Sequence, residues 1–108
     1  MTKFINQLRS AWHHGKGSKY TRKGNYQLAL HHFQAALEYA TRSDNQASIP
    51  LETECIARSF MRLGDYVNAK QNAEKSLSLY KLQGSGTAFD EGIKRVTELL
   101  KIIEQKET

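Results

Sequence analysis

The chain has 108 residues, of which 39% are hydrophobic and 25% are charged. These values are typical of one folded domain and exclude a disordered chain. The single cysteine, Cys55, excludes a disulfide within the chain and favours a reducing compartment, so we expect a cytoplasmic protein. The sequence has no apolar run of about 18 residues and no apolar segment near its start, so we expect no membrane span and no secretory signal.

The net charge of +5 is concentrated in the first 41 residues. This segment contains six basic residues against one acidic residue, Glu38, whereas residues 42–108 contain ten of each kind. All four histidines lie in the same segment, as the adjacent pairs His13-His14 and His31-His32. The basic excess therefore belongs to the first part of the chain and not to the whole protein.

The first predicted element is an amphipathic helix that continues to Arg22. Its apolar residues recur at helical spacing: Phe4, Ile5, Leu8, Ala11 and Trp12. We expect Trp12 to lie in the core or to cap it, with a half-exposed Trp12 against another subunit as the alternative. Gly15 and Gly17 weaken the helix, and Gly15 marks a position where it could break.

The next segments predict three further helices and the turns between them. Gly24 suits a left-handed helix end and Asn25 an N-cap, so a helix is expected over residues 26–42. A polar turn at 43–46 precedes Ser48, a plausible N-cap with Pro50 in the first turn, and a helix to Leu63. The following helix is expected over residues 66–82, ended by the sequence Gly84-Ser85-Gly86.

The last predicted helix covers about residues 87–106. Its stripe consists of Phe89, Ile93, Val96, Leu100 and Ile103, widened by Leu99 and Ile102. We interpret it as a capping helix that covers the preceding pair. The alternative is an interface helix, because a stripe spaced like this also suits a seam with a partner helix.

A stretch of the sequence repeats after 40 residues. Gly24-Asn25-Tyr26 returns as Gly64-Asp65-Tyr66, and an alanine and a leucine follow each tyrosine after three and eleven residues. A fixed period of this size is typical of a helical-repeat architecture. We therefore predict an all-α fold of about five helices in one domain over residues 1–108.

The repeat resembles that of tetratricopeptide repeat (TPR) proteins in a long-period variety. The residues that carry the resemblance in the first copy are Gly17, Tyr20, Gly24, Asn25, Tyr26, Ala29, Phe33 and Ala36. Those in the second copy are Ala57, Phe60, Gly64, Asp65, Tyr66 and Ala69. The resemblance implies antiparallel helix pairs stacked as a short right-handed superhelix, with repeat one at about 10–43 and repeat two at about 49–83.

The resemblance also implies a function, which is binding a peptide or a helix in a concave groove lined by the first helix of each pair. The positions that match the groove are His14, Ser18, Thr21, Arg22, Glu54, Arg58, Met61 and Arg62. The three arginines among them suit bidentate capture of carboxylates, which favours an acidic partner. The alternative is that these arginines only solubilise the surface.

The sequence shows no convincing set of catalytic residues, so we expect no enzyme and no cofactor. Gly15-Lys16-Gly17-Ser18 lacks the spacing of a phosphate-binding loop. Neighbouring histidines point about 100° apart on a helix and cannot both reach one ion, so we expect solvated histidines and no metal site. The alternative is a site with one histidine from each of two antiparallel helices. Cys55 would form a reactive pair with a histidine only if the fold brought them together, and a packed cysteine is the expected case.

Two further hypotheses concern partners. The basic first segment, with Phe4, Trp12 and Tyr20 among its charges, suits a nucleic-acid-binding protein as the alternative function. Two repeats are also fewer than the three or so that a stable array needs. Either the extra N-terminal turns and the last helix complete the core within one chain, or a second copy covers exposed apolar residues, and we expect a weak homodimer.

Overall fold

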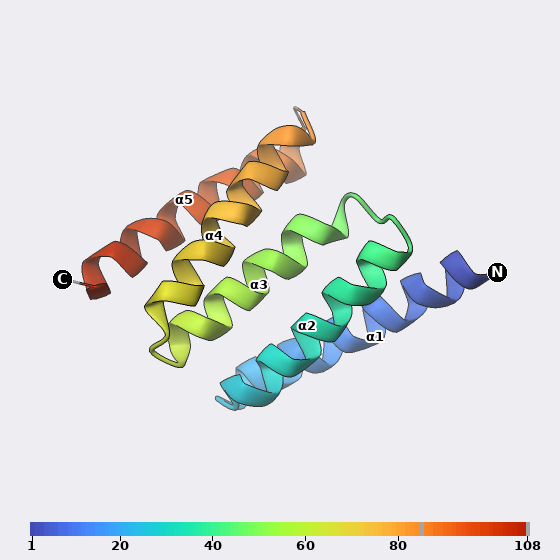
Figure 1. The fold of residues 1–108 in the computed structure, drawn as a ribbon, viewed down its shortest axis with the longest axis horizontal. Coiled ribbons are helices and arrows are strands. Elements are labelled where there is room, and N and C mark those ends of the chain that lie inside the picture. Colours follow the sequence, from blue (N-terminus) through green and yellow to red (C-terminus); the bar gives the residue numbers. More distant parts are fainter. Residues whose placement is uncertain (85, 108) are drawn as a thin grey trace.

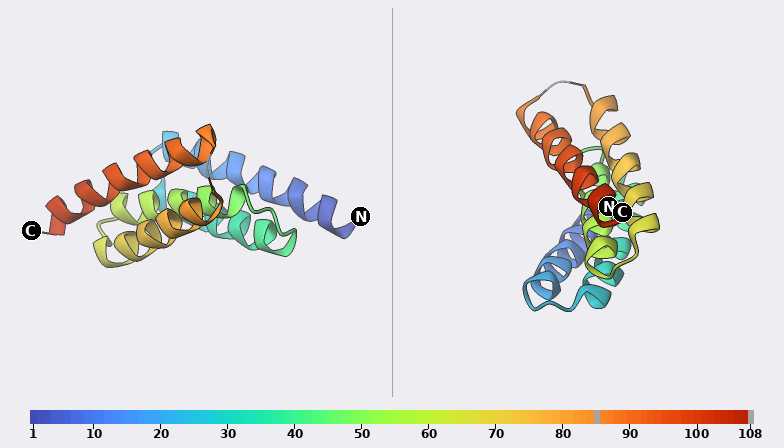
Figure 2. Two further views of the ribbon diagram at one scale, coloured as in Figure 1. Left: turned by 90° about the horizontal axis from the view of Figure 1, so that it is seen from above. Right: turned by 90° about the vertical axis from the view of Figure 1, so that its left-hand side faces the viewer.

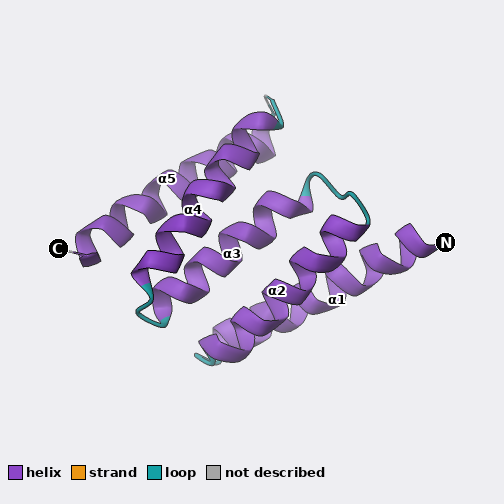
Figure 3. Ribbon diagram, viewed as in Figure 1, coloured by secondary structure: helices purple, strands orange, loops and turns teal. Residues whose placement is uncertain are grey.

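The chain folds into five α-helices (Figures 1 and 3). The computed structural model describes residues 1–84 and 86–107, and no strand occurs in these ranges. The helices are α1 (Thr2–Arg22), α2 (Tyr26–Arg42), α3 (Ser48–Arg62), α4 (Tyr66–Leu82) and α5 (Thr87–Glu107). The predicted all-α fold with a C-terminal helix is thereby confirmed.

Each helix packs against the next one along the chain, and α5 also reaches α3. The result is an elongated molecule with extents of 48 × 33 × 19 Å. Seen from one end, α1 and α5 lie on the same side of the molecule with α3 between them, whereas α2 and α4 lie on the other side (Figure 2). The first helix of each pair therefore faces the inside of a shallow crescent.

The two turns that the sequence repeats have the same geometry. Gly24 and Gly64 adopt left-handed conformations with φ of 77° and 81°, which a residue with a side chain would adopt at a cost. Asn25 and Asp65 each accept a 3.2 Å hydrogen bond on the side-chain Oδ1 from the amide three residues on. The 40-residue period of the sequence is thus also a period of the backbone.

Two serine hydrogen bonds, one within each helix pair, recur with the same period of 40 residues. The Ser10 hydroxyl donates to the Ala36 carbonyl at 2.9 Å, and the Ser76 hydroxyl donates to the Pro50 carbonyl at 2.8 Å. Positions 10 and 50 are equivalent, as are 36 and 76, so donor and acceptor have exchanged places between the repeats. Both hydrogen bonds are buried and join the two helices of a pair.

Two apolar clusters form the core. The first consists of Ala29, Leu30, Phe33 and Ile56. The second consists of Ala57, Ala69, Ala73, Tyr80, Val96, Leu99 and Ile103. Phe60 packs against both clusters and connects them. Because α5 supplies three residues of the second cluster, it covers the second helix pair, as a capping helix should.

Glycines allow close helix approach at two points of this core. A Cβ on Gly17 would lie 2.6 Å from the Phe33 ring, and one on Gly92 would lie 2.5 Å from the Tyr80 ring. The absence of a side chain at position 17 therefore lets α1 approach α2 closely. The break considered at Gly15 does not occur, because α1 is continuous from Thr2 to Arg22.

The prediction for the apolar stripe of α1 is wrong. Trp12 is 57% exposed, and Phe4, Ile5 and Leu8 are exposed with it. The residues of α1 that are buried are Asn6, Ser10 and Gly17. At about 100° per residue these lie on the side of the helix opposite the stripe. The close contacts of Ser10 and Gly17 with α2 fix the rotation of α1, and this rotation turns the stripe toward solvent.

The start of α3 differs in detail from the prediction, whereas α4 has the predicted end. Ser48 does not cap α3 but is its first residue, and the Asn45 side chain accepts a hydrogen bond from its amide at 3.3 Å. Helix α4 ends at Leu82, before Gly84 with φ of 93°. Of the terminating sequence Gly84-Ser85-Gly86, Ser85 lies outside the described residues. In the described part of the chain, no helix combines the length and apolar character needed to cross a bilayer.

Candidate functional site

A cavity of about 330 Å³ lies between α1, α2 and α3. Six of the eight predicted groove residues line it: Ser18, Thr21, Arg22, Arg58, Met61 and Arg62. They come from the C-terminal parts of α1 and α3, which the fold places on the inner side of the crescent. Tyr26, Phe33, Cys55 and Ser59 complete the lining.

The three arginines of this cavity differ in how far their charges are already neutralised. Arg58 donates one hydrogen bond of 3.2 Å to Glu54 and keeps a side chain that is 43% exposed. Neither Arg22 nor Arg62 forms an ion pair with any residue that the structure describes. The Arg62 guanidinium lies over the Tyr26 ring, 5.6 Å from its centroid, an arrangement that orients the side chain and leaves its donors available.

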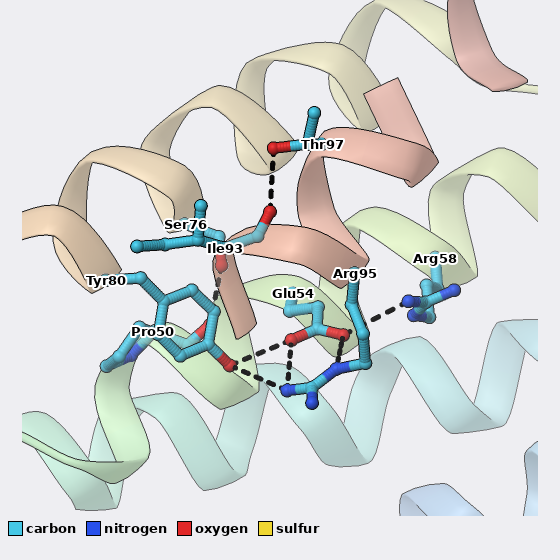
Figure 4. Close-up of polar contacts among 8 residues, drawn as sticks. All are labelled: Pro50, Glu54, Arg58, Ser76, Tyr80, Ile93, Arg95 and Thr97. Carbon is cyan, nitrogen blue, oxygen red and sulfur yellow. Dashed lines mark hydrogen bonds and ion pairs between the residues drawn. The ribbon is translucent and has the colours of Figure 1, made fainter. Parts of the chain in front are cut away.

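Glu54 does not line the groove as a binding residue, which corrects the sequence-based expectation. Its side chain is buried (Figure 4). Arg95 donates to its two carboxylate oxygens at 2.9 and 3.1 Å, and the Tyr80 hydroxyl donates at 2.8 Å. Glu54 therefore joins α3 to α4 and α5, and its charge is neutralised by arginines of the protein itself.

The surroundings of Glu54 determine its protonation. Burial acts to raise the pKa of the Glu54 carboxyl, but hydrogen bonds from Arg95 and Tyr80 and the charges of Arg95 and Arg58 outweigh it. The pKa is therefore held below its ordinary value, and the carboxylate is ionised at neutral pH. Burial, and after it the hydrogen bond to the Glu54 carboxylate, raise the pKa of the Tyr80 hydroxyl, although Arg95 opposes them.

His14 lies in a neighbouring cavity of about 240 Å³ between α1 and α3, which it lines together with Glu52, Asn45 and Ser48. Its Nδ1 is 2.9 Å from Oε1 of Glu52. The hydrogen bond to Glu52 raises the pKa of His14, although burial opposes it. Glu52 is only 3% exposed, so His14 is the partner that stabilises a buried carboxylate.

Cys55 lies between the two cavities, on the same face of α3 as Glu52. Burial and the nearby carboxylates Glu52 and Glu54 raise the pKa of its thiol to about 12. Without a metal ion the free thiol is therefore protonated at neutral pH. The expectation of a packed cysteine holds in part, since the residue is half-buried and also lines the larger cavity.

The histidines are less solvated than predicted. Only His31 is exposed, and the other three are half-buried. The Nδ1 atoms of His13 and His32 lie 3.0 Å apart, and His13 stacks on the Tyr39 ring. Burial first, and neighbouring positive charge second, lower the pKa of both His13 and His32. They form an aromatic contact between α1 and α2.

Sequence reasoning missed some residues of the site. The sequence identifies Tyr26 and Phe33 only as residues of the repeat resemblance, although both also border the larger cavity. Glu52 had not been considered, although its spacing of three from Cys55 places both on one helix face. The contacts of Glu52 and Cys55 with His14 depend on how α1 crosses α3, which the repeat pattern does not specify.

Comparison of the chain with protein-family models, with curated proteins and with solved structures gives no match in any of the three. The resemblance to TPR proteins therefore depends on the repeat itself and on the residues quoted for it.

Proposed function

We propose that the chain is a non-catalytic helical-repeat module of the TPR kind, which binds an acidic peptide or helix in the groove between α1 and α3. The observation that carries this proposal is the pair of arginines, Arg22 and Arg62, beside a cavity of about 330 Å³. Neither guanidinium has an acidic partner among the described residues, so both can pair with a ligand.

The chemistry of the groove supports an acidic and partly apolar ligand. A guanidinium binds a carboxylate through two parallel hydrogen bonds, which are stronger than neutral ones. Tyr26, Phe33 and Met61 add apolar surface to the same cavity. An amphipathic segment with acidic side chains next to leucine or phenylalanine would use both features.

The repeated turn and the exchanged serine contacts support a TPR-like stack, because each element recurs at the same period. The free thiol of Cys55 fits a reducing compartment, and we propose that the module acts in the cytoplasm. The basic first segment then serves solubility or attracts the acidic partner from a distance.

The experiment that tests the proposal measures the anisotropy of labelled peptides. The probes are amphipathic peptides with glutamate and leucine, and matched peptides with glutamine for glutamate. We expect the glutamate peptides to bind and the double variant Arg22→Glu/Arg62→Glu to bind at least 10-fold more weakly, since each charge-assisted hydrogen bond contributes about 1.5–3 kcal/mol. Arg58 is left unchanged because an acidic residue there would face Glu54.

The matched control is Lys75→Glu/Lys101→Glu, which changes the net charge equally at exposed sites on α4 and α5. It should bind like the natural chain. Equal loss in both variants, equal binding of glutamine peptides, or tighter binding of a labelled RNA oligonucleotide than of every glutamate peptide would contradict the proposal.

A further inference from the structure

Three side chains with metal-binding atoms meet between α1 and α3. A ring nitrogen of His14, a carboxylate oxygen of Glu52 and the sulfur of Cys55 all lie within 4.8 Å of one another. Glu52 and Cys55 are three residues apart and share one face of α3. His14 reaches them from α1, with its Nδ1 2.9 Å from Oε1 of Glu52.

The spacing of these atoms is close to that of a tetrahedral metal site. Bonds of 2.0–2.3 Å to zinc place neighbouring ligand atoms about 3.3–3.8 Å apart. Side-chain rotations that move the atoms by about 1 Å would therefore bring all three onto one ion. The backbone does not need to move, because the helices already hold the three residues around a common point.

The charge of the cluster matches a divalent cation. Zinc would displace the Cys55 thiol proton to solvent. The carboxylate of Glu52 and the resulting thiolate of Cys55 together neutralise two positive charges, and neutral His14 adds the third ligand atom. Charge balance matters here because Glu52 is only 3% exposed, and an unbalanced charge at this depth would be costly. The one hydrogen bond found for Glu52 in the described part of the chain comes from His14, so no other contact competes with an ion.

We propose that His14, Glu52 and Cys55 form a zinc site that fastens α1 of the first helix pair to α3 of the second. Nitrogen, oxygen and sulfur are the ligands that zinc takes from proteins, and three of them leave a fourth position for water or another ligand. The site is reachable, since His14 and Glu52 line the cavity of about 240 Å³ and Cys55 lines the larger one.

This site is one that the sequence-based argument did not consider. The expectation of no metal depended on adjacent histidines, which cannot share an ion on one helix. Ligands from two different helices are not limited in that way. The other close pair, His13 and His32, offers two nitrogens that are 3.0 Å apart, and no third ligand lies with them among the described residues.

The test is a titration of the reduced full-length chain with cobalt(II), which occupies zinc sites and is visible in absorption spectra. We expect one equivalent to produce a thiolate-to-cobalt charge-transfer band together with visible bands of a tetrahedral ion, and zinc to abolish both. Cys55→Ser should remove the charge-transfer band. His14→Gln and Glu52→Gln should each weaken cobalt binding at least 10-fold, since even outer-shell changes at metal sites cost 10–100-fold.

The control variants are His13→Gln and His31→Gln, which remove histidines outside the cluster and should leave the band unchanged. Circular dichroism checks that each variant keeps the helical fold. Zinc should also slow alkylation of Cys55 in the natural chain but not in His14→Gln. Cobalt binding without a thiolate band, a band that persists in His14→Gln and Glu52→Gln, or a band lost equally in His13→Gln would overturn the proposal.

Discussion

Gly15 and Gly17 lie two residues apart on α1 but have different surroundings. A Cβ on Gly17 would lie 2.6 Å from the Phe33 ring, whereas a Cβ on Gly15 would meet no atom within 4 Å. Phe33 is buried in the first core cluster, so its ring has little room to move away. The contact between Gly17 and Phe33 therefore sets the packing of α1 against α2, and it requires a residue without a side chain.

We expect Gly17→Ala to lower the free energy of unfolding by about 1–3 kcal/mol, because overpacking a filled core forces neighbours to shift. Gly15→Ala is the matched control and should raise the free energy of unfolding by up to about 1 kcal/mol. The reason is that alanine stabilises an exposed position inside a helix more than glycine does. Urea unfolding followed by far-ultraviolet circular dichroism gives both values. Equal stability of the two variants would show that the Gly17 contact is not tight.

At the scale of elements, Glu54 connects three helices. It lies on α3 and accepts hydrogen bonds from Tyr80 on α4 and from Arg95 on α5 (Figure 4). Arg95 is therefore a charged residue of the last helix whose partner is a buried carboxylate. The capping helix is therefore held by polar contacts as well as by its apolar stripe.

We expect Glu54→Gln to lower the free energy of unfolding by about 1–3 kcal/mol at neutral pH, because charged hydrogen bonds are lost from a buried group. The pKa of Glu54 is lowered from its ordinary value of 4.5 in the folded protein. Its contribution is complete above that value and is lost as the pH falls through the lower folded pKa.

The measurement is urea unfolding of both proteins, with a chelator present, at neutral pH and at several values below pH 4.5, the ordinary pKa of the glutamate. The difference between the natural chain and Glu54→Gln should shrink on acidification. A difference that stays constant down to the lowest pH would contradict the ion-pair account of this network.

The whole molecule leaves one apolar surface uncovered. Phe4, Leu8 and Trp12 are exposed on α1, away from its buried residues Asn6, Ser10 and Gly17. The C-terminal end of the stack has α5 to cover it, whereas the N-terminal end has no equivalent helix in the described part of the chain. Exposed patches of large apolar side chains favour association.

We therefore expect a weak homodimer formed through this face of α1. Sedimentation velocity at two protein concentrations should show an average sedimentation coefficient that rises with concentration. Leu8→Ser/Trp12→Ser should remove the rise, whereas the control Val67→Ser/Leu82→Ser, which changes exposed apolar residues on α4, should keep it. A natural chain that sediments as a monomer at both concentrations would contradict the prediction.

The sequence determined the helices and the turns between them, because the signals involved are local. Gly24 with Asn25 and Gly64 with Asp65 specify a left-handed residue followed by an N-cap, and the same signal 40 residues apart produced the same turn. The helices expected over 26–42 and 66–82 have those bounds. Six predicted groove residues share one cavity because they are spaced at helical intervals on α1 and α3.

The tertiary structure alone decided which face of α1 is buried, where the charge of Glu54 is neutralised, and that His14 meets Glu52 and Cys55. An apolar stripe indicates that a helix has a preferred face, but the small residues Ser10 and Gly17 allow a closer approach on the other side. The partners of Glu54 and His14 lie 26 to 41 residues away in the sequence. Such contacts depend on crossing angles between helices, which local spacing does not encode.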